Sequence, residues 1–390
     1  MTTAKLLSSF NAQSQKFFLQ FGGQGSPYLK ELAKLYQEPA LKEFFEISFQ
    51  TTEEIFAREN KSPFLNEGFD FKAWVENPDA APSEDYLARA PISVPGIFMT
   101  QIANYVLITK QGNPTTELIQ ATGAISGHSQ GVIAGALVGL GKEGKDFLKA
   151  YSDFLRFVFY LGYNGQKVYP DFSIPADVAE ANLANGDKNP APMVAVIGYS
   201  KGELESRVKE TNESLGLKGK DTIYISLYNT PDSMILSALP SSLVKFRAKW
   251  KSEMEEKKFK FVFLKTTAPF HCPFMVESLP LFENGDASVV PFPYSGSDLK
   301  VPVYSIFDGH NLQKDGNLRN ILFKMVLIEP LYWDLAIAPV FNDSSIHAIV
   351  DFGPSVVSQR LTGGHLKAKN IEKLSLCASN AKELKVILEV

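Results

Sequence analysis

Residues 122–138 read TGAISGHSQGVIAGALV. An apolar strand ends here at Gly127-His-Ser-Gln-Gly131, which fits the pattern G-x-S-x-G, and an apolar helix begins directly after it. A serine on such a sharp strand-to-helix turn is exposed, and the flanking glycines let the backbone pass closely. The helix directs its first N–H groups and the positive end of its dipole toward the turn. The stretch therefore predicts that Ser129 is a nucleophile.

Strands and helices alternate on both sides of this turn. Short apolar runs predict strands at residues 17–21, 301–307, 347–352 and near 373–376. Helical patterns lie between them, and this alternation favours a parallel sheet covered on both faces. We therefore expect an α/β fold whose large domain is α/β-hydrolase-like and discontinuous, made of residues 1–165 and 266–390.

The middle of the chain has a different pattern. A proline-rich linker leads into a compact series of strand, helix, strand, strand, helix and strand between Met193 and Leu264. This order is that of a ferredoxin-like split βαβ unit. We expect an inserted small domain over residues 166–265.

Composition and charge exclude several classes of protein. The 390 residues carry 39 Lys and Arg against 43 Asp and Glu, a formal net charge of −4, which argues against a nucleic-acid partner. Two cysteines cannot form a disulfide framework or a four-cysteine zinc site. The first residues lack the apolar core of a signal peptide, and the apolar stretch 92–110 is interrupted by polar residues and a proline. We expect a cytoplasmic protein with no membrane contact, no metal and no cofactor.

A serine nucleophile needs a base, normally a histidine. Of the five histidines, His271 lies where the chain returns from the small domain to the large one, and ligand clefts are frequent at such junctions. His128, inside the turn, should point away from Ser129 and act as a structural or secondary contact. His365 follows two glycines in an expected loop near the C-terminus. An esterase with this turn would take its base from there, so a serine esterase or thioesterase is the alternative from another class.

Four motifs occur in a specific order: Phe21-Gly-Gly-Gln-Gly-Ser26, Gly127-His-Ser-Gln-Gly131, Ala268-Pro-Phe-His-Cys272 and Asp351-Phe-Gly-Pro354. Together they resemble the acyl-CoA:acyl-carrier-protein acyltransferase (malonyl/acetyl transacylase) family. The likeness extends over residues 17–364 and is closest to the acetyl (starter) acyltransferase domain of fungal-type (type I) fatty acid synthases. It implies transfer of an acyl group from coenzyme A, as substrate, to a carrier-protein thiol in fatty acid or polyketide synthesis. The mechanism would be ping-pong through an acyl-serine.

The resemblance also implies roles for single residues. Ser129 would accept the acyl group, and His271 would remove its proton and later activate the carrier thiol. In this family a backbone carbonyl orients the histidine, and the matching position here is Tyr332. The backbone N–H groups of Gln24 and Gln130 would form the oxyanion hole, where the loss of one donor typically costs about 3 kcal/mol.

A departure from the family pattern indicates which acyl group the protein accepts. Malonyl transferases carry an Arg-Gly pair on the helix after the turn, and the arginine pairs with the malonyl carboxylate. The matching glycine here is Gly162, so Leu161 takes the place of the arginine. Arg156, five residues earlier, projects about 140° away around the helix. A carboxylate buried beside Leu161 would lack a partner. We expect a small neutral acyl group, acetyl, with Phe270 limiting its size; malonyl is the alternative.

Further residues concern the cleft and the partners. His128 and Asn229, the latter in the family's Asn-x-Pro turn, should line the cleft. The second small-domain helix and its end are basic, with Lys245, Arg247, Lys249, Lys251, Lys257, Lys258 and Lys260. Carrier proteins of this family are acidic, so this helix is a candidate docking face, with an ordinary solvated helix as the alternative. Members of the family are often domains of larger assemblies, so a partner synthase is a further candidate.

Overall fold

The structure of the protein is a computed structural model that describes residues 3–25, 27–170 and 173–389; Ser26 of the first motif lies outside these residues. Its strands are β1 (Lys16–Phe21), β2 (Thr122–Gly127), β3 (Met193–Ile197), β4 (Tyr224–Thr230), β5 (Ser233–Ser237), β6 (Lys260–Phe263), β7 (Leu331–Tyr332), β8 (Ile346–Asp351) and β9 (Leu374–Cys377). Its α-helices are α1 (Lys5–Ala12), α2 (Leu29–Tyr36), α3 (Lys42–Glu59), α4 (Phe71–Glu76), α5 (Glu84–Leu87), α6 (Ala90–Lys110), α7 (Thr115–Ala121), α8 (Gly131–Gly139), α9 (Gly144–Val168), α10 (Ala176–Ala184), α11 (Lys201–Ser214), α12 (Pro240–Glu256), α13 (Ser278–Leu281), α14 (Leu318–Leu327), α15 (Trp333–Ala336), α16 (Ala338–Asn342), α17 (Val357–Ala368) and α18 (Ala381–Leu388).

A parallel sheet with the order β2-β1-β8-β9 forms the centre of the large part of the molecule. The predicted strands at 17–21, 347–352 and 373–376 are confirmed as β1, β8 and β9. The strand predicted at 301–307 is wrong, because this segment makes only isolated bridges among the described residues, Val303 to Ile125 beside β2 and Tyr304 to Asn311. Pro302 has no N–H, so a regular ladder cannot continue through it.

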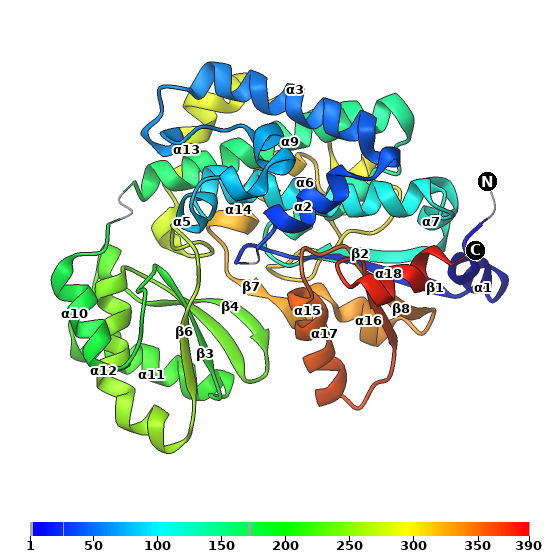
Figure 1. The fold of residues 1–390 in the computed structure, drawn as a ribbon. Helices are drawn as coiled ribbons and strands as arrows, with labels where there is room; N and C mark the ends of the chain where they lie inside the picture. Colours follow the sequence, from blue (N-terminus) through cyan, green and yellow to red (C-terminus); the bar gives the residue numbers. More distant parts are fainter. Residues whose placement is uncertain (1–2, 26, 171–172, 390) are drawn as a thin grey trace.

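Helices cover both sides of this sheet (Figure 1). α8 follows β2 and packs on β1 and β2, and the long helices α6 and α9 pack on each other above it. The α6 helix is long and apolar enough to cross a membrane by length and composition, but 94% of its most apolar window is buried inside the fold. The interrupted apolar stretch 92–110 therefore lies in a buried helix of the fold.

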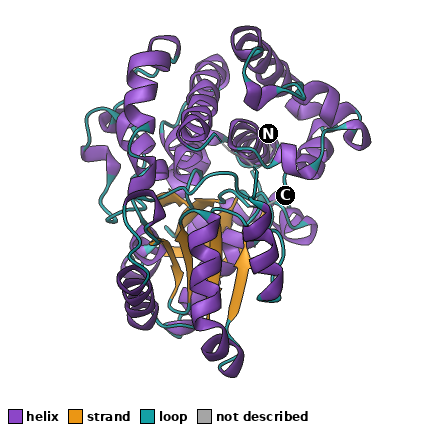
Figure 2. Cartoon of the chain, turned by 90° about the vertical axis from the view of Figure 1, so that its left-hand side faces the viewer, coloured by secondary structure: helices purple, strands orange, loops and turns teal. Residues whose placement is uncertain are grey.

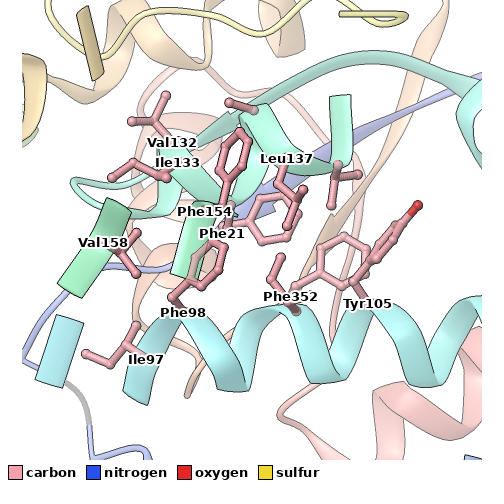
Figure 3. Close-up of a cluster of buried hydrophobic side chains, with 14 of the residues drawn as sticks. Phe21, Ile97, Phe98, Tyr105, Val132, Ile133, Leu137, Phe154, Val158 and Phe352 are labelled. Carbon is pink, nitrogen blue, oxygen red and sulfur yellow. The ribbon is translucent and has the colours of Figure 1, made fainter. Parts of the chain in front are cut away.

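Aromatic and aliphatic side chains fill the space between these helices and the end of β1 (Figure 3). Phe21 at the end of β1 stacks on Phe352, with ring centroids 4.9 Å apart, and Phe98 of α6 and Leu137 of α8 are fully buried beside them. Burying an aromatic or leucine side chain of this kind contributes about 1.5–3 kcal/mol. This core holds the first turn of α8 against the carboxyl ends of the strands.

The second sheet, of order β6-β3-β5-β4-β7, belongs mostly to the middle of the chain. Its first four strands are antiparallel, and their order with α11 and α12 is the predicted series of a split βαβ unit. Figure 2 looks onto this part of the molecule, with helices in front of the strands. One face of the sheet has its own core with α11 and α12, formed around Leu236 and Phe246. The other face, with Met193 and Ile235, joins the main core.

Three features of this region differ from the sequence analysis. The expected linker contains a helix, α10. The helix α9 continues to Val168, past the expected boundary at residue 165. The strand β7, from the large part of the chain, pairs with β4 in parallel and completes the sheet. The boundaries at 165/166 and 265/266 stay predictions.

Candidate active site

Ser129 lies on the sharp turn between β2 and α8, as predicted. Its φ angle is 54°, a left-handed conformation that a non-glycine residue adopts only under constraint. The constraint comes from the flanking glycines. A Cβ atom on Gly127 would lie 2.0 Å from the carbonyl carbon of Gly131, and one on Gly131 would lie 2.4 Å from the carbonyl oxygens of Phe21 and Gly22. The turn therefore requires glycine at both positions.

Ser129 and His271 form a hydrogen-bonded pair. The Oγ atom of Ser129 lies 2.7 Å from Nε2 of His271, and both residues are buried, with 8% and 1% of their surface exposed. His271 also has a positive φ, 58°. Its Nδ1 lies 3.0 Å from the carbonyl oxygen of Glu329. Because Nδ1–H donates to this carbonyl, Nε2 is left with the lone pair that a base needs.

The orienting carbonyl thus belongs to Glu329, and the expectation of Tyr332 is wrong. Glu329 precedes Pro330, which disfavours the helical conformation and leaves Glu329 after the end of α14. Tyr332 is fixed elsewhere. It pairs with Tyr228 in the β4–β7 ladder, and its N–H donates to the carbonyl of Ile306. The motif therefore identified the right segment, but the orienting carbonyl lies three residues before the predicted one.

Burial keeps both active-site histidines neutral. It lowers the pKa of His271 to about 4, and the nearby His128 lowers this pKa further. Burial also lowers the pKa of His128 to about 4, although its hydrogen bond to Asn229 acts in the opposite direction. A neutral imidazole can accept the serine proton at any pH well above 4.

His128 and Asn229, both predicted for the cleft, contact each other. Nε2 of His128 donates to Oδ1 of Asn229 at 2.8 Å, and the ring of His128 lies edge-on to Trp333. His365 is buried in α17 rather than in a loop, so that expectation is wrong. Its Nε2 donates to the carbonyl oxygen of Asn229 at 2.9 Å. His365 therefore supports Asn229, and the histidine that contacts Ser129 is His271.

The loop that carries Gln24 lies against Ser129. A Cβ atom on Gly23 would come 3.2 Å from Cβ of Ser129. Side chains of α6 hold the loop in place. Gln101 donates to the carbonyl of Gly22 at 2.6 Å, and Gln24 donates to Oγ of Ser93 at 2.8 Å. Neither Gln101 nor Ser93 could be predicted from the sequence, because a polar residue in an apolar helix has no distinguishing pattern.

Gln130, the other expected oxyanion residue, is the N-cap of α8. Its side chain donates to the carbonyl of Val94 at 3.0 Å, which anchors the start of α8 to α6. Its backbone N–H belongs to the first turn of the helix, where the dipole is positive. The oxyanion roles of Gln24 and Gln130 stay predictions.

Leu161 and Phe270 belong to one buried region. Leu161 is fully buried in α9, and Gly165, four residues later, lies on the same helix face. A Cβ atom on Gly165 would lie 3.1 Å from the ring of Phe270, the residue before His271. Arg156 points elsewhere and forms an ion pair with Glu54 of α3. The face of α9 toward Phe270 therefore carries Leu161 and a glycine.

The basic helix α12 is more occupied than expected. Four of the seven basic side chains have partners within residues 166–265: Arg247 with Asp187, Lys249 with Glu210, Lys251 with the carbonyl of Ala184, and Lys257 with Glu253. The three ion pairs among these contacts offset part of the positive charge of the helix. In the described part of the chain, no group of three or more His, Cys, Asp or Glu side chains is placed to hold a metal ion.

Comparison with known proteins identifies the family. A family model described as "Starter unit:ACP transacylase in aflatoxin biosynthesis" matches residues 19–271, well over half of the chain. The chain is 28% identical over 359 residues to fatty acid synthase subunit beta of Saccharomyces cerevisiae, and 29% identical over 365 residues to the same subunit of Schizosaccharomyces pombe. The matches cover 87% and 88% of this chain, but only 17% of each relative.

Solved structures show the same fold. MCAT from Streptococcus pneumoniae superposes with a TM-score of 0.66 at 19% identity, covering 96% of this chain and 99% of that one. This likeness confirms the α/β fold with a parallel-sheet core. The family match agrees with the glycine-flanked turn and the serine–histidine pair. It shows that the chain belongs to the starter unit:ACP transacylases, enzymes that transfer acyl groups to an acyl carrier protein.

Proposed function

We propose that this enzyme transfers a small neutral acyl group, acetyl, from coenzyme A to the thiol of an acyl carrier protein through an acyl-Ser129 intermediate. The observation that carries the proposal is the 2.7 Å contact between Ser129 Oγ and His271 Nε2 on a glycine-flanked turn. A buried serine beside a neutral, oriented imidazole is the arrangement of an activated nucleophile.

The first half-reaction acylates the serine. His271 Nε2 takes the proton of Ser129 as Oγ attacks the thioester carbonyl and the O–C bond forms. The N–H groups of Gln24 and Gln130 stabilise the oxyanion. The C–S bond then breaks, and the imidazolium gives its proton to the departing coenzyme A thiolate. The carbonyl of Glu329 holds the ring in one orientation throughout and stabilises its charged form.

The second half-reaction repeats these steps in reverse. The carrier thiol gives its proton to His271 Nε2, and the thiolate attacks the acyl-serine ester. The new C–S bond forms as the bond to Oγ breaks, and Oγ recovers its proton from His271. No net acid or base is consumed, so one neutral histidine serves both halves.

The described side chains near Ser129 and His271 support a neutral acyl group, because they offer no partner for a carboxylate. Leu161 is buried, and the resemblance implies that it takes the place of the arginine of malonyl transferases; Arg156 is paired with Glu54. Burial is the largest cause of the lowered pKa of His271, and His128 lowers it further. A malonyl carboxylate in this place would lose its hydration without gaining a cation.

Intact-mass measurement tests the proposal. The protein is mixed with acetyl-, malonyl- and longer acyl-CoA in parallel, and we expect an acetyl adduct on the wild type and none on Ser129→Ala. Alanine is smaller than serine, so the fold should remain. A malonyl adduct that forms faster than the acetyl adduct would favour the malonyl alternative, which the malonyltransferase names of several structural neighbours suggest.

A second comparison separates transferase from esterase. His271→Ala should slow acylation far more than His365→Ala, because His365 contacts the Asn229 carbonyl and not the serine. Rapid loss of the acyl group to water without a carrier protein would instead support the esterase. The relatives' names suggest that the pathway is fatty acid synthesis and that the acceptor belongs to a synthase; we propose both for this chain, together with the cytoplasmic location.

A further inference from the structure

His310, which is not part of the serine–histidine pair, lies between two aspartates. Its Nδ1 lies 2.6 Å from Oδ1 of Asp308, and its Nε2 lies 2.7 Å from Oδ2 of Asp315. A neutral imidazole carries one N–H and can donate to one carboxylate only, whereas an imidazolium donates to both. The arrangement therefore fits the charged form of His310.

The surroundings of His310 also favour this charged form. Partial burial lowers its pKa, but the hydrogen bonds and charges of Asp308 and Asp315 outweigh this effect and raise the pKa above its ordinary value of 6.5. Lys314, the other charged residue between positions 302 and 315, is exposed to solvent. The side chain of His310 is 39% exposed, so it can exchange protons with solvent. His310 therefore loses its charge as the pH rises through its raised pKa.

The segment 302–315, which we call the clasp loop, contacts both sheets. In the parallel sheet, the N–H of Tyr304 donates to the carbonyl of Ile125 in β2. In the other sheet, the N–H of Tyr332 in β7 donates to the carbonyl of Ile306. β2 leads into the turn that carries the serine of the pair, and β7 begins just after the carbonyl that orients the histidine. The clasp loop therefore joins the two halves of the site.

Backbone hydrogen bonds fold the clasp loop around His310. The N–H of Ser305 donates to the carbonyl of His310. The N–H of Leu312 donates to the carbonyl of Val303. The Oγ atom of Ser305 accepts a hydrogen bond from the N–H of Asp308 at 3.4 Å. The two ion pairs of His310 add side-chain contacts across the same loop, so the loop is held most firmly while His310 is charged.

The charge of His310 also acts on Glu329, whose carbonyl accepts the hydrogen bond of His271. Burial raises the pKa of the Glu329 carboxyl, and the charge of Asp308 raises it further, whereas the charges of Lys324 and His310 lower it. When His310 becomes neutral, Lys324 is the one of these two cations that remains beside the carboxylates. Their mutual repulsion then increases, and it acts on the segment that holds His271 in place.

We propose that His310 is a positioning residue whose charged form keeps the clasp loop closed and thereby holds the Glu329 carbonyl against His271; the proposal rests on the function proposed above. Loss of the proton removes one of the two donor groups, and a ring lone pair then faces a carboxylate oxygen. Acylation should therefore slow as the pH rises through the pKa of His310, although His271 itself stays neutral and able to accept a proton.

The pH dependence of acylation gives the first test. The wild type is mixed with acetyl-CoA between about pH 6 and pH 9.5, and rapid quenching with intact-mass measurement gives the rate. The carrier protein is left out, so its thiol cannot contribute to the profile. We expect the rate to fall about tenfold toward high pH, the loss typical of one hydrogen bond to a charged group. A rate that stays constant over this range would overturn the proposal.

Two substitutions separate the charge of His310 from its hydrogen bonding. His310→Arg keeps a cation that can donate to both carboxylates at every pH, so the rate should stay high with no alkaline fall. His310→Gln donates without a charge, so acylation should be about tenfold slower throughout and equally flat. A role in folding alone would not change the shape of the pH profile. An alkaline fall that persists in either variant would assign the titration to another group and overturn the proposal.

A matched control is the exposed His347 of β8. Its Nδ1 lies 2.8 Å from the carbonyl of Ser345, just before the same strand. His347→Gln removes one histidine with the same chemistry as His310→Gln, and it should keep the wild-type rate and the wild-type alkaline fall. Loss of the fall in this control would refute the assignment to His310.

A second probe distinguishes the failure of this proposal from the failure of the proposed function. A fluorophosphonate needs the serine–histidine pair but no thioester: Oγ of Ser129 bonds to phosphorus, fluoride leaves, and His271 takes the serine proton. If acetyl-CoA and the other donors give no adduct, the proposed function fails. A phosphonylation rate that falls at high pH in the wild type and not in His310→Gln would still support the positioning role. If the acetyl adduct forms at a rate that does not depend on pH in this range, the positioning proposal alone fails.

Discussion

The acylation rate should stay high in acid, because His271 holds its neutral form there. Its pKa is lowered from an ordinary 6.5 to about 4, chiefly by burial. At pH 5 a histidine of pKa 4 is about 90% neutral, whereas one of pKa 6.5 is about 3% neutral. If the neutral form is the base, the acylation rate at pH 5 should therefore be about thirtyfold higher than that expected of an exposed histidine. The rate should reach half of its maximum near pH 4.

Rapid-quench mixing with acetyl-CoA between pH 3.5 and 8, followed by intact-mass measurement of the acyl-enzyme, would give this profile. A midpoint near pH 6.5 would refute the reasoning, since it would mean that His271 is not desolvated in the working enzyme. Unfolding must be excluded as a cause of lost rate, so circular dichroism is recorded at each pH.

The same pKa shifts affect stability in a direction that can be worked out. The unfolded chain protonates His128 and His271 near pH 6.5, and the folded chain does so only near pH 4. Their contribution to the free energy of unfolding is thus complete above pH 6.5 and is lost as the pH falls toward 4. A shift of this size corresponds to about 3 kcal/mol per histidine. Asp351 acts oppositely, because burial raises its pKa to about 6.

Three substitutions give further tests. Leu161→Arg should raise the ratio of kcat/KM for malonyl-CoA to that for acetyl-CoA about tenfold to a hundredfold, because an arginine can bind the carboxylate by two hydrogen bonds. As a control, Arg156→Ala should leave this ratio unchanged. A wild type that prefers malonyl-CoA would contradict the argument. Asp351→Asn should lower the free energy of unfolding in urea by about 1–3 kcal/mol, because the carboxylate accepts hydrogen bonds from three residues; an unchanged value would show that these bonds contribute nothing net. Gly131→Ala should abolish acylation because of the 2.4 Å contacts at the turn, whereas Gly363→Ala, in α17 with open space around it, should stabilise the fold by about 0.5–1 kcal/mol.

Local patterns allowed the turn at Ser129 and the residue that contacts it, His271, to be predicted. The turn at Ser129 depends on contacts between residues close in sequence, so the glycine spacing carries most of the information. His271 was found because its position at a domain junction and its motif pointed to the same residue. The strands β1, β8 and β9 were found because a buried parallel strand is a continuous apolar run.

Contacts between distant segments could not be predicted in this way. Whether Glu329 or Tyr332 turns its carbonyl to His271 depends on how β7 pairs with β4, and nothing local in the sequence records that pairing. The role of His365 depends on α17 packing against β4. The two residues of β7 are too few for a periodic pattern, and the glycines before His365 suggested a loop where tertiary packing maintains a helix.

The dyad itself depends on how the two sheets dock. Ser129 follows β2 of the parallel sheet, whereas both anchors of His271 belong to the other sheet. The carbonyl of Phe270 accepts a hydrogen bond from Ser237 of β5 at 2.9 Å, and the carbonyl of Glu329, just before β7, accepts one from the histidine ring. The left-handed backbone of His271 stays in place only while these contacts hold it. A small movement of one sheet against the other would separate Oγ of Ser129 from Nε2 of His271. The acylation rate should therefore depend on the relative position of the two sheets as well as on the chemistry of the two side chains.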